Sequence, residues 1–128
     1  MLVVKIFTLY PDLFPGPLDM GIYKKAKENK TWDLKVINIR DYSIDGRGSV
    51  DDTPFGGGSG MLLRPDIIAS ALDKNITPGE KIIYLSPKGK KFDQLEAKSI
   101  SKLNKINILC GHFEGIDQRL LETRNIEE

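Results

Sequence analysis

The sequence contains few residues that form disulfides or bind metals, with one Cys and one His among 128 residues, and it has a single Trp. Cys110 has no partner for a disulfide within the chain, and one Cys with one His argues against a zinc site. No run of about 18 apolar residues occurs, and Lys5 interrupts the first apolar stretch before a signal-type segment forms. We therefore expect a cytoplasmic protein that does not bind membranes.

Composition and charge indicate one soluble globular domain. Hydrophobic residues make up 40% of the chain and charged residues 29%, and the net charge is only +1. No global positive field therefore favours nucleic acid, but residues 81–105 carry seven Lys against two acidic side chains. This Lys-rich stretch is suited either to phosphate contacts or to a solvated helix face.

Short apolar stretches alternate with stretches of helical spacing along most of the chain. The predicted strands cover residues 3–9, 34–40, 81–85 and 106–110, and the predicted helices cover residues 18–28, 65–72, 94–103 and 117–123. Within the helices, Ile22, Leu95 and Ile100 are among the residues expected to face inward. The alternation predicts an α/β fold with a mostly parallel sheet and helices on both faces.

Residues 41–61 form a long segment in which no regular element is predicted. It contains six of the twelve glycines, and loops longer than about 12–15 residues inside a compact domain usually have a function. A flexible linker is the alternative. However, Asp51 and Asp52 precede the glycines of residues 56–60, and apolar residues resume at Met61. We therefore expect a loop that is anchored at both ends.

Two glycine-containing segments follow predicted strands. In open parallel sheets, ligands bind beyond the carboxyl ends of the strands, where Ser86–Gly89 and Gly111–Asp117 are expected. Gly111 permits close approach of a ligand to the backbone, Phe113 offers an aromatic wall, and Glu114 can accept hydrogen bonds or hold a cation. The alternative for Ser86–Gly89 is an ordinary strand-to-helix turn. Neither segment is a P-loop or a dinucleotide-binding fingerprint.

Five motifs occur in an order that resembles one known family. They are Phe7–Pro11 with Phe14, Asn38–Asp41, Val50–Met61, Leu85–Gly89, and Cys110–Asp117 with Arg119. Together they resemble the bacterial tRNA (guanine-N1)-methyltransferases of the TrmD type, and the resemblance covers essentially the whole chain. It implies a SPOUT-class fold with a trefoil knot, working as a homodimer.

The resemblance also implies an activity and a set of site residues. The family transfers a methyl group from S-adenosylmethionine to N1 of guanine 37 of tRNA, in a reaction similar to a magnesium-assisted one. The implied cofactor-binding residues are Tyr84, Leu85, Ser86, Pro87, Gly111, Phe113, Glu114 and Gly115, with Glu114 also the candidate for a metal. The residues implied to lie toward the target guanine are Asp51, Asp52, Gly56, Gly57, Gly58, Ser59 and Gly60.

The chain also departs from the pattern of the family. Phe113 stands where the family commonly has Tyr, Asp45–Gly48 replaces a more basic run, and the Asp expected as general base would follow Glu128. We therefore expect residues 1–128 to be the N-terminal cofactor-binding domain, without the knot-completing segment and the C-terminal domain, and to be inactive alone. The alternative is a non-catalytic dimerisation or RNA-binding module with the same fold.

Overall fold

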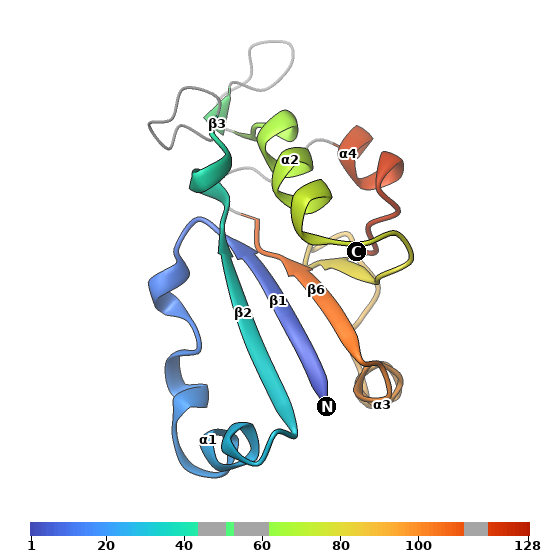
Figure 1. Cartoon of the computed structure of the whole chain (residues 1–128). Helices are drawn as coiled ribbons and strands as arrows, with labels where there is room; N and C mark the ends of the chain where they lie inside the picture. Colours follow the sequence, from blue (N-terminus) through green and yellow to red (C-terminus); the bar gives the residue numbers. More distant parts are fainter. Residues whose placement is uncertain (44–50, 53–61, 112–117) are drawn as a thin grey trace.

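A parallel sheet of four strands lies at the centre of the computed structural model, which describes residues 1–43, 51–52, 62–111 and 118–128 (Figure 1). The strands are β1 (Leu2–Thr8), β2 (Trp32–Asn38), β5 (Ile82–Tyr84) and β6 (Lys105–Leu109). Their order in the sheet is β2, β1, β6, β5. All neighbours are parallel, so the carboxyl ends of the four strands lie at one edge, as the sequence predicts.

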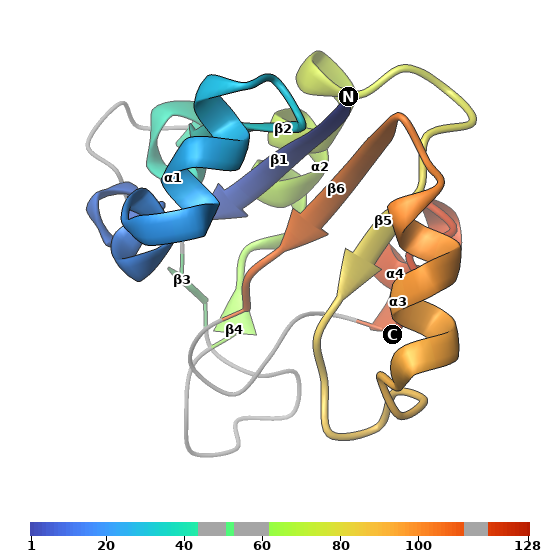
Figure 2. The same ribbon diagram turned by 90° about the horizontal axis from the view of Figure 1, so that it is seen from below.

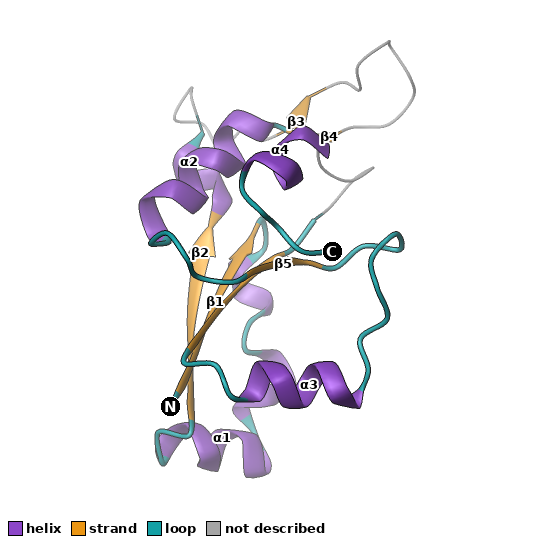
Figure 3. Cartoon of the chain, turned by 90° about the vertical axis from the view of Figure 1, so that its right-hand side faces the viewer, coloured by secondary structure: helices purple, strands orange, loops and turns teal. Residues whose placement is uncertain are grey.

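Helices cover both faces of this sheet, and Figure 3 shows α2 and α3 on opposite sides of it. The helices are α1 (Gly21–Glu28), α2 (Pro65–Asn75), α3 (Gln94–Ser101) and α4 (Gln118–Thr123). Pro65 starts α2 where a missing N–H costs no hydrogen bond. The Asp93 carboxylate caps α3 by accepting the Glu96 N–H at 2.9 Å. Local sequence chemistry therefore sets the start of both helices.

The main core lies between the sheet and the pair α2 and α4. Phe7 and Leu109 project from β1 and β6 into this core, where they join buried side chains of α2 and α4. The members of the cluster are Phe7, Leu9, Ile39, Ile67, Ile68, Ala71, Leu72, Ile82, Leu109, Leu120, Leu121 and Ile126. The opposite face is buried at Ile6 and Ile106. The sheet is thus enclosed on two sides, as expected for parallel strands.

Two helical positions differ from the prediction. Ile22 and Leu95 are exposed, with 76% and 78% of their surface accessible, although their spacing predicts inward positions. Both lie in helices of eight residues that contribute no fully buried side chain. A short helix at the margin of the sheet presents only part of its apolar stripe, so periodicity alone overestimates its burial.

The segment 41–61 contains more regular structure than the sequence predicts. A 3-10 helix covers Ile39–Tyr42, and β3 (Asp51–Asp52) pairs in antiparallel fashion with β4 (Leu62–Leu63). The prediction of no regular element was therefore wrong at Asp41 and Tyr42, in the 3-10 helix, and at Asp51 and Asp52, in β3. A two-residue strand is too short to show an alternating pattern. Residues 44–50 and 53–61 lie outside the described residues.

Most element boundaries differ from the prediction by one to three residues, and two of these differences have a clear local cause. The predicted second strand continues to residue 40, but β2 ends at Asn38, whose side chain accepts the Arg40 N–H at 3.0 Å and starts the 3-10 helix. The predicted first helix begins at residue 18, but residues 16–19 form a separate 3-10 helix before α1. Side-chain capping and the Pro15–Pro17 region, rather than apolar spacing, set these boundaries.

The last residues of the chain extend the sheet beyond β5. Ile83 and Glu127 form a parallel bridge, in which the Tyr84 N–H donates to the Glu127 carbonyl at 2.7 Å and the Glu127 N–H donates to the Ile82 carbonyl at 2.9 Å. Glu127 and Glu128 therefore lie beside the carboxyl end of β5. Among the described helices, none has both the length and the apolar character needed to cross a membrane.

Candidate functional site

The carboxyl ends of β5 and β6 lie side by side, and the segments that follow them leave from the same edge (Figure 2). The Cys110 N–H donates to the Phe7 carbonyl at 2.9 Å, so the chain stays alongside β1 for one residue past β6. This hydrogen bond fixes the backbone just before Gly111. The sequence prediction that the two glycine-containing segments start at one edge is confirmed for their described residues.

Gly111 lies against the ring of Tyr84, and the contact leaves no room for a larger residue. A Cβ atom added to Gly111 would lie 2.5 Å from Tyr84 Cε1 and 2.9 Å from its hydroxyl oxygen. Tyr84 is itself half-buried at the end of β5. The absent side chain of Gly111 therefore makes room for the Tyr84 ring in its observed position, a reason that sequence reasoning did not find.

The turn after β5 is stabilised by hydrogen bonds within the turn and by contacts with Glu128. Ser86 Oγ accepts the Lys88 N–H at 3.0 Å, and the Gly89 N–H donates to the Ser86 carbonyl at 3.1 Å. Ser86 Oγ also donates to Glu128 Oε2 at 2.6 Å. Gly89 lies against the backbone of Glu128, because an added Cβ would lie 2.5 Å from the carbonyl carbon.

Burial and charge raise the pKa of two groups at this edge. Burial raises the pKa of the Tyr84 phenol, and the negative charge of Glu128 raises it further. Burial also raises the pKa of the Cys110 thiol. Both groups therefore stay protonated near neutral pH, so Tyr84 keeps a hydroxyl that can donate a hydrogen bond.

The structure describes only part of the predicted site. Tyr84, Ser86 and Gly111 are partly buried and lie near each other, whereas Leu85 and Pro87 of the same turn are exposed. The predicted residues Phe113, Glu114, Gly115, Gly56, Gly57, Gly58, Ser59 and Gly60 lie outside the described residues. For Asp51 and Asp52 only the backbone is described, in β3. Within the described part of the chain, no group of three His, Cys, Asp or Glu side chains could hold a metal ion.

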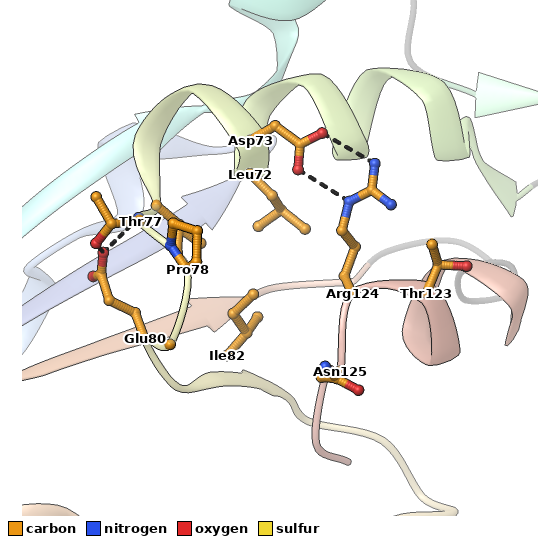
Figure 4. Close-up of a pocket in the computed structure, with 11 residues that line it drawn as sticks. Leu72, Asp73, Thr77, Pro78, Glu80, Ile82, Thr123, Arg124 and Asn125 are labelled. Atoms are coloured by element: carbon orange, nitrogen blue, oxygen red, sulfur yellow. Dashed lines mark hydrogen bonds and ion pairs between the residues drawn. The ribbon is translucent and has the colours of Figure 1, made fainter.

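A separate cavity of about 590 Å³ lies between the end of α2, residues 76–80 and residues 123–125 (Figure 4). Arg124 donates two hydrogen bonds of 3.0 Å to Asp73, so its guanidinium is already paired with a carboxylate. The cavity lies near the start of β5 at Ile82 and therefore away from the carboxyl edge of the sheet. Ligands of parallel α/β sheets bind at the carboxyl edge, so we assign the candidate site to the turns after β5 and β6.

Comparison with known proteins gives a consistent result. A family profile described as "tRNA (Guanine-1)-methyltransferase TrmD" matches residues 2–128. A tRNA (guanine-N(1)-)-methyltransferase from Pelagibacter ubique (strain HTCC1062) is 64% identical over 124 residues, which cover 97% of this chain and 54% of that protein. The enzyme of the same name from Alkaliphilus oremlandii (strain OhILAs) is 46% identical, over 94% of this chain and 52% of that protein.

The fold is likewise similar to a solved structure. The crystal structure of tRNA (m1G37) methyltransferase from Aquifex aeolicus matches with a TM-score of 0.86 and 30% sequence identity, and it covers 98% of this chain and 58% of that chain. The chain spans about half the length of the curated relatives that it matches. The profile match extends over all five motifs quoted above. The chain therefore belongs to the TrmD family of tRNA (guanine-1)-methyltransferases.

Proposed function

We propose that the natural-length protein containing these 128 residues transfers a methyl group from S-adenosylmethionine to N1 of guanine 37 in tRNA. The observation that carries this proposal is that the motif segments after β5 and β6 begin side by side at the carboxyl edge of a parallel sheet, where ligands of such folds bind. Family membership supports the same reaction. Residues 1–128 then act as the N-terminal cofactor-binding domain, and segments after Glu128 complete the trefoil knot and the C-terminal part.

The residues at this edge fit a nucleoside cofactor. The exposed Leu85 side chain offers an apolar surface, Tyr84 a half-buried ring and a hydroxyl, and Gly111 a backbone without a side chain. We propose that the turn after β5 contributes Tyr84, Leu85, Ser86 and Pro87. We further propose that the segment after β6 contributes Gly111, Phe113, Glu114 and Gly115.

The chemistry requires a base on the tRNA side of the site. S-adenosylmethionine supplies, when bound, a methyl group on a positively charged sulfonium. N1 of guanine carries a proton and is a poor nucleophile until a base removes that proton. The carboxylate of Glu128 already accepts a hydrogen bond from Ser86, so it is not our candidate. We propose that the base is an Asp after Glu128, in a part that the longer relatives have room for.

The remaining parts of the proposal concern partners. We propose that Asp51, Asp52 and residues 56–60 lie toward the guanine, that two copies form a homodimer, and that Mg²⁺ assists with Glu114 as a ligand. The pairing of β3 with β4 supports the first point, because it brings both ends of the glycine-rich segment together. Segments that connect paired strands often contact ligands, which is consistent with this part of the proposal.

A methylation assay tests the proposed function. The natural-length protein, incubated with labelled S-adenosylmethionine, is expected to label an unmodified tRNA transcript that has guanine at position 37. It is expected to leave a matched transcript with adenine at position 37 unlabelled, because adenine lacks the O6 acceptor and the 2-amino donor by which a site for guanine would recognise its base. Absence of label in both transcripts from a folded protein that binds tRNA would favour the non-catalytic module.

The Lys-rich turn after β5 gives a second prediction, on tRNA affinity. Lys88 and Lys91 are exposed, whereas Lys90 pairs with Glu96 at 3.3 Å. If these residues contact phosphates, Lys88→Gln and Lys91→Gln are each expected to reduce the slope of log affinity against log salt by roughly 0.7–0.9. Lys90→Gln, the matched control, is expected to change it less. If all three variants keep the salt slope of the unmodified protein, these Lys residues lie on a solvated face instead.

A further inference from the structure

The carboxylate of Glu128 reaches the turn after β5 from a distant part of the sequence. Its Oε2 accepts the Ser86 Oγ hydrogen bond at 2.6 Å, although 42 residues separate the two positions. Ser86 Oγ in turn accepts the Lys88 N–H at 3.0 Å. The Ser86 hydroxyl thus accepts a hydrogen bond from Lys88 within the turn and donates one to Glu128 outside it. Glu128 therefore fixes the direction in which this hydroxyl donates.

The backbone around Glu128 makes this contact specific. Glu127 pairs with β5 through hydrogen bonds to Ile82 and Tyr84, which places the next residue beside the turn. The backbone of Glu128 then lies against Gly89, where an added Cβ would be 2.5 Å from its carbonyl carbon. Glu128 is half-buried, so its hydrogen bond is partly protected from water. The turn Ser86–Gly89 is therefore stabilised both by its own hydrogen bonds and by its contacts with Glu128.

We propose that Glu128 is a positioning residue, which holds the Ser86–Gly89 turn in the conformation that binds S-adenosylmethionine. This inference rests on the proposed function and adds to it a residue that acts through Ser86 rather than by contact with the cofactor. The carboxylate has a second effect, since its negative charge lies near the Tyr84 phenol at the same edge. Glu128 thereby links two of the proposed cofactor-binding residues.

A calorimetric measurement of the affinity of the natural-length protein for S-adenosylmethionine tests this proposal. Glu128→Ala removes a hydrogen bond to a charged group, and its loss is expected to weaken the affinity by about tenfold or more. Glu128→Gln keeps an acceptor for Ser86 and is expected to weaken it less. Glu122→Ala is the matched control, because Glu122 is an exposed carboxylate of α4. The Glu122→Ala protein is expected to bind S-adenosylmethionine as tightly as the unmodified protein.

A double-mutant cycle separates positioning from a general loss of structure. If Glu128 acts through Ser86, the Ser86→Ala/Glu128→Ala protein is expected to bind no more weakly than Ser86→Ala alone. In methyl-transfer assays the KM for the cofactor is expected to rise more than kcat falls. Multiplied losses in the double variant, or an affinity of Glu128→Ala within twofold of the unmodified protein, would overturn the proposal.

The ionisation of Tyr84 gives a readout that does not depend on activity. Glu128→Gln is expected to lower the pKa of the Tyr84 phenol, measured by NMR of ring-labelled tyrosine and assigned with Tyr84→Phe. An unchanged Tyr84 pKa would show that the carboxylate does not lie at this turn and would overturn the placement. If the unmodified protein binds no S-adenosylmethionine, the proposed function fails, whereas this titration still shows where Glu128 lies.

Discussion

The 128-residue chain alone is expected to methylate tRNA at no useful rate, even when it is folded. In our proposal the turns after β5 and β6 supply two walls of the pocket, and residues after Glu128 supply the third. A cofactor held on two sides loses burial and hydrogen bonds. A loss of about 4 kcal/mol in binding free energy would weaken the affinity about a thousandfold.

The chemical step is expected to suffer independently of binding. Absence of a general base typically lowers a rate by about 10² to 10⁴-fold, because N1 of guanine then keeps its proton for longer. The two losses act on different steps, so raising the cofactor concentration is expected to restore only the first. Saturation with S-adenosylmethionine therefore distinguishes a weak pocket from a missing base.

The measurement compares this chain with the natural-length protein under identical conditions. Both receive labelled S-adenosylmethionine and unmodified tRNA, and circular dichroism establishes that the shorter chain is folded. Comparable turnover by the two proteins would refute the view that essential groups lie beyond Glu128. Cofactor binding by the short chain without turnover would show that the pocket needs only the segments after β5 and β6.

Gly111→Val is expected to remove cofactor binding from the natural-length protein. The new side chain would occupy the space against the backbone, and its Cβ would lie 2.5 Å from Tyr84 Cε1. Tyr84 must then turn away, so the substitution alters two proposed cofactor-binding residues at once. Displacement of the Tyr84 ring together with the loss of ligand space is expected to weaken the affinity by about a hundredfold or more, which corresponds to about 3 kcal/mol of binding free energy.

The stability of the fold is expected to change much less than the affinity. The atoms that a Cβ on Gly111 would meet belong to the end of the Tyr84 side chain, which can rotate, and not to the backbone. Calorimetric titration with S-adenosylmethionine and S-adenosylhomocysteine measures the affinity, and thermal unfolding checks the fold. Gly111→Ala adds the Cβ without the two methyl groups and is expected to give an intermediate loss. Unchanged affinity in a folded Gly111→Val protein would show that the pocket lies elsewhere.

The parallel sheet, and the edge at which the turns after β5 and β6 begin, were predictable from sequence because their signals are local. Buried parallel strands are continuous apolar runs, as in β1 and β6, and the helices between them show helical spacing. Once the strands are parallel, a general rule places ligands at their carboxyl ends. Ser86–Gly89 and Gly111 could therefore be assigned to one edge before any coordinates were known.

The contacts that complete the site were not predictable in this way. Ser86 and Glu128 are 42 residues apart, and neither has a neighbour in sequence that indicates the hydrogen bond between them. Gly111 was predicted to leave room for a ligand, whereas the structure shows that it first leaves room for Tyr84. The short pairing of β3 with β4 also escaped prediction, because two residues carry no periodicity. Each of these features depends on the tertiary fold.

The order of the strands also determines when the domain can fold during synthesis. β1 pairs on one side with β2, which follows soon after it, but its other partner, β6, is made about 100 residues later. A ribosome that adds 5–20 residues per second needs roughly 5–20 s to reach β6. During that interval one edge of β1 has no strand to pair with, and such edges attract other chains. The nascent protein thus depends on a strand made about 100 residues later to complete the pairing of its first strand.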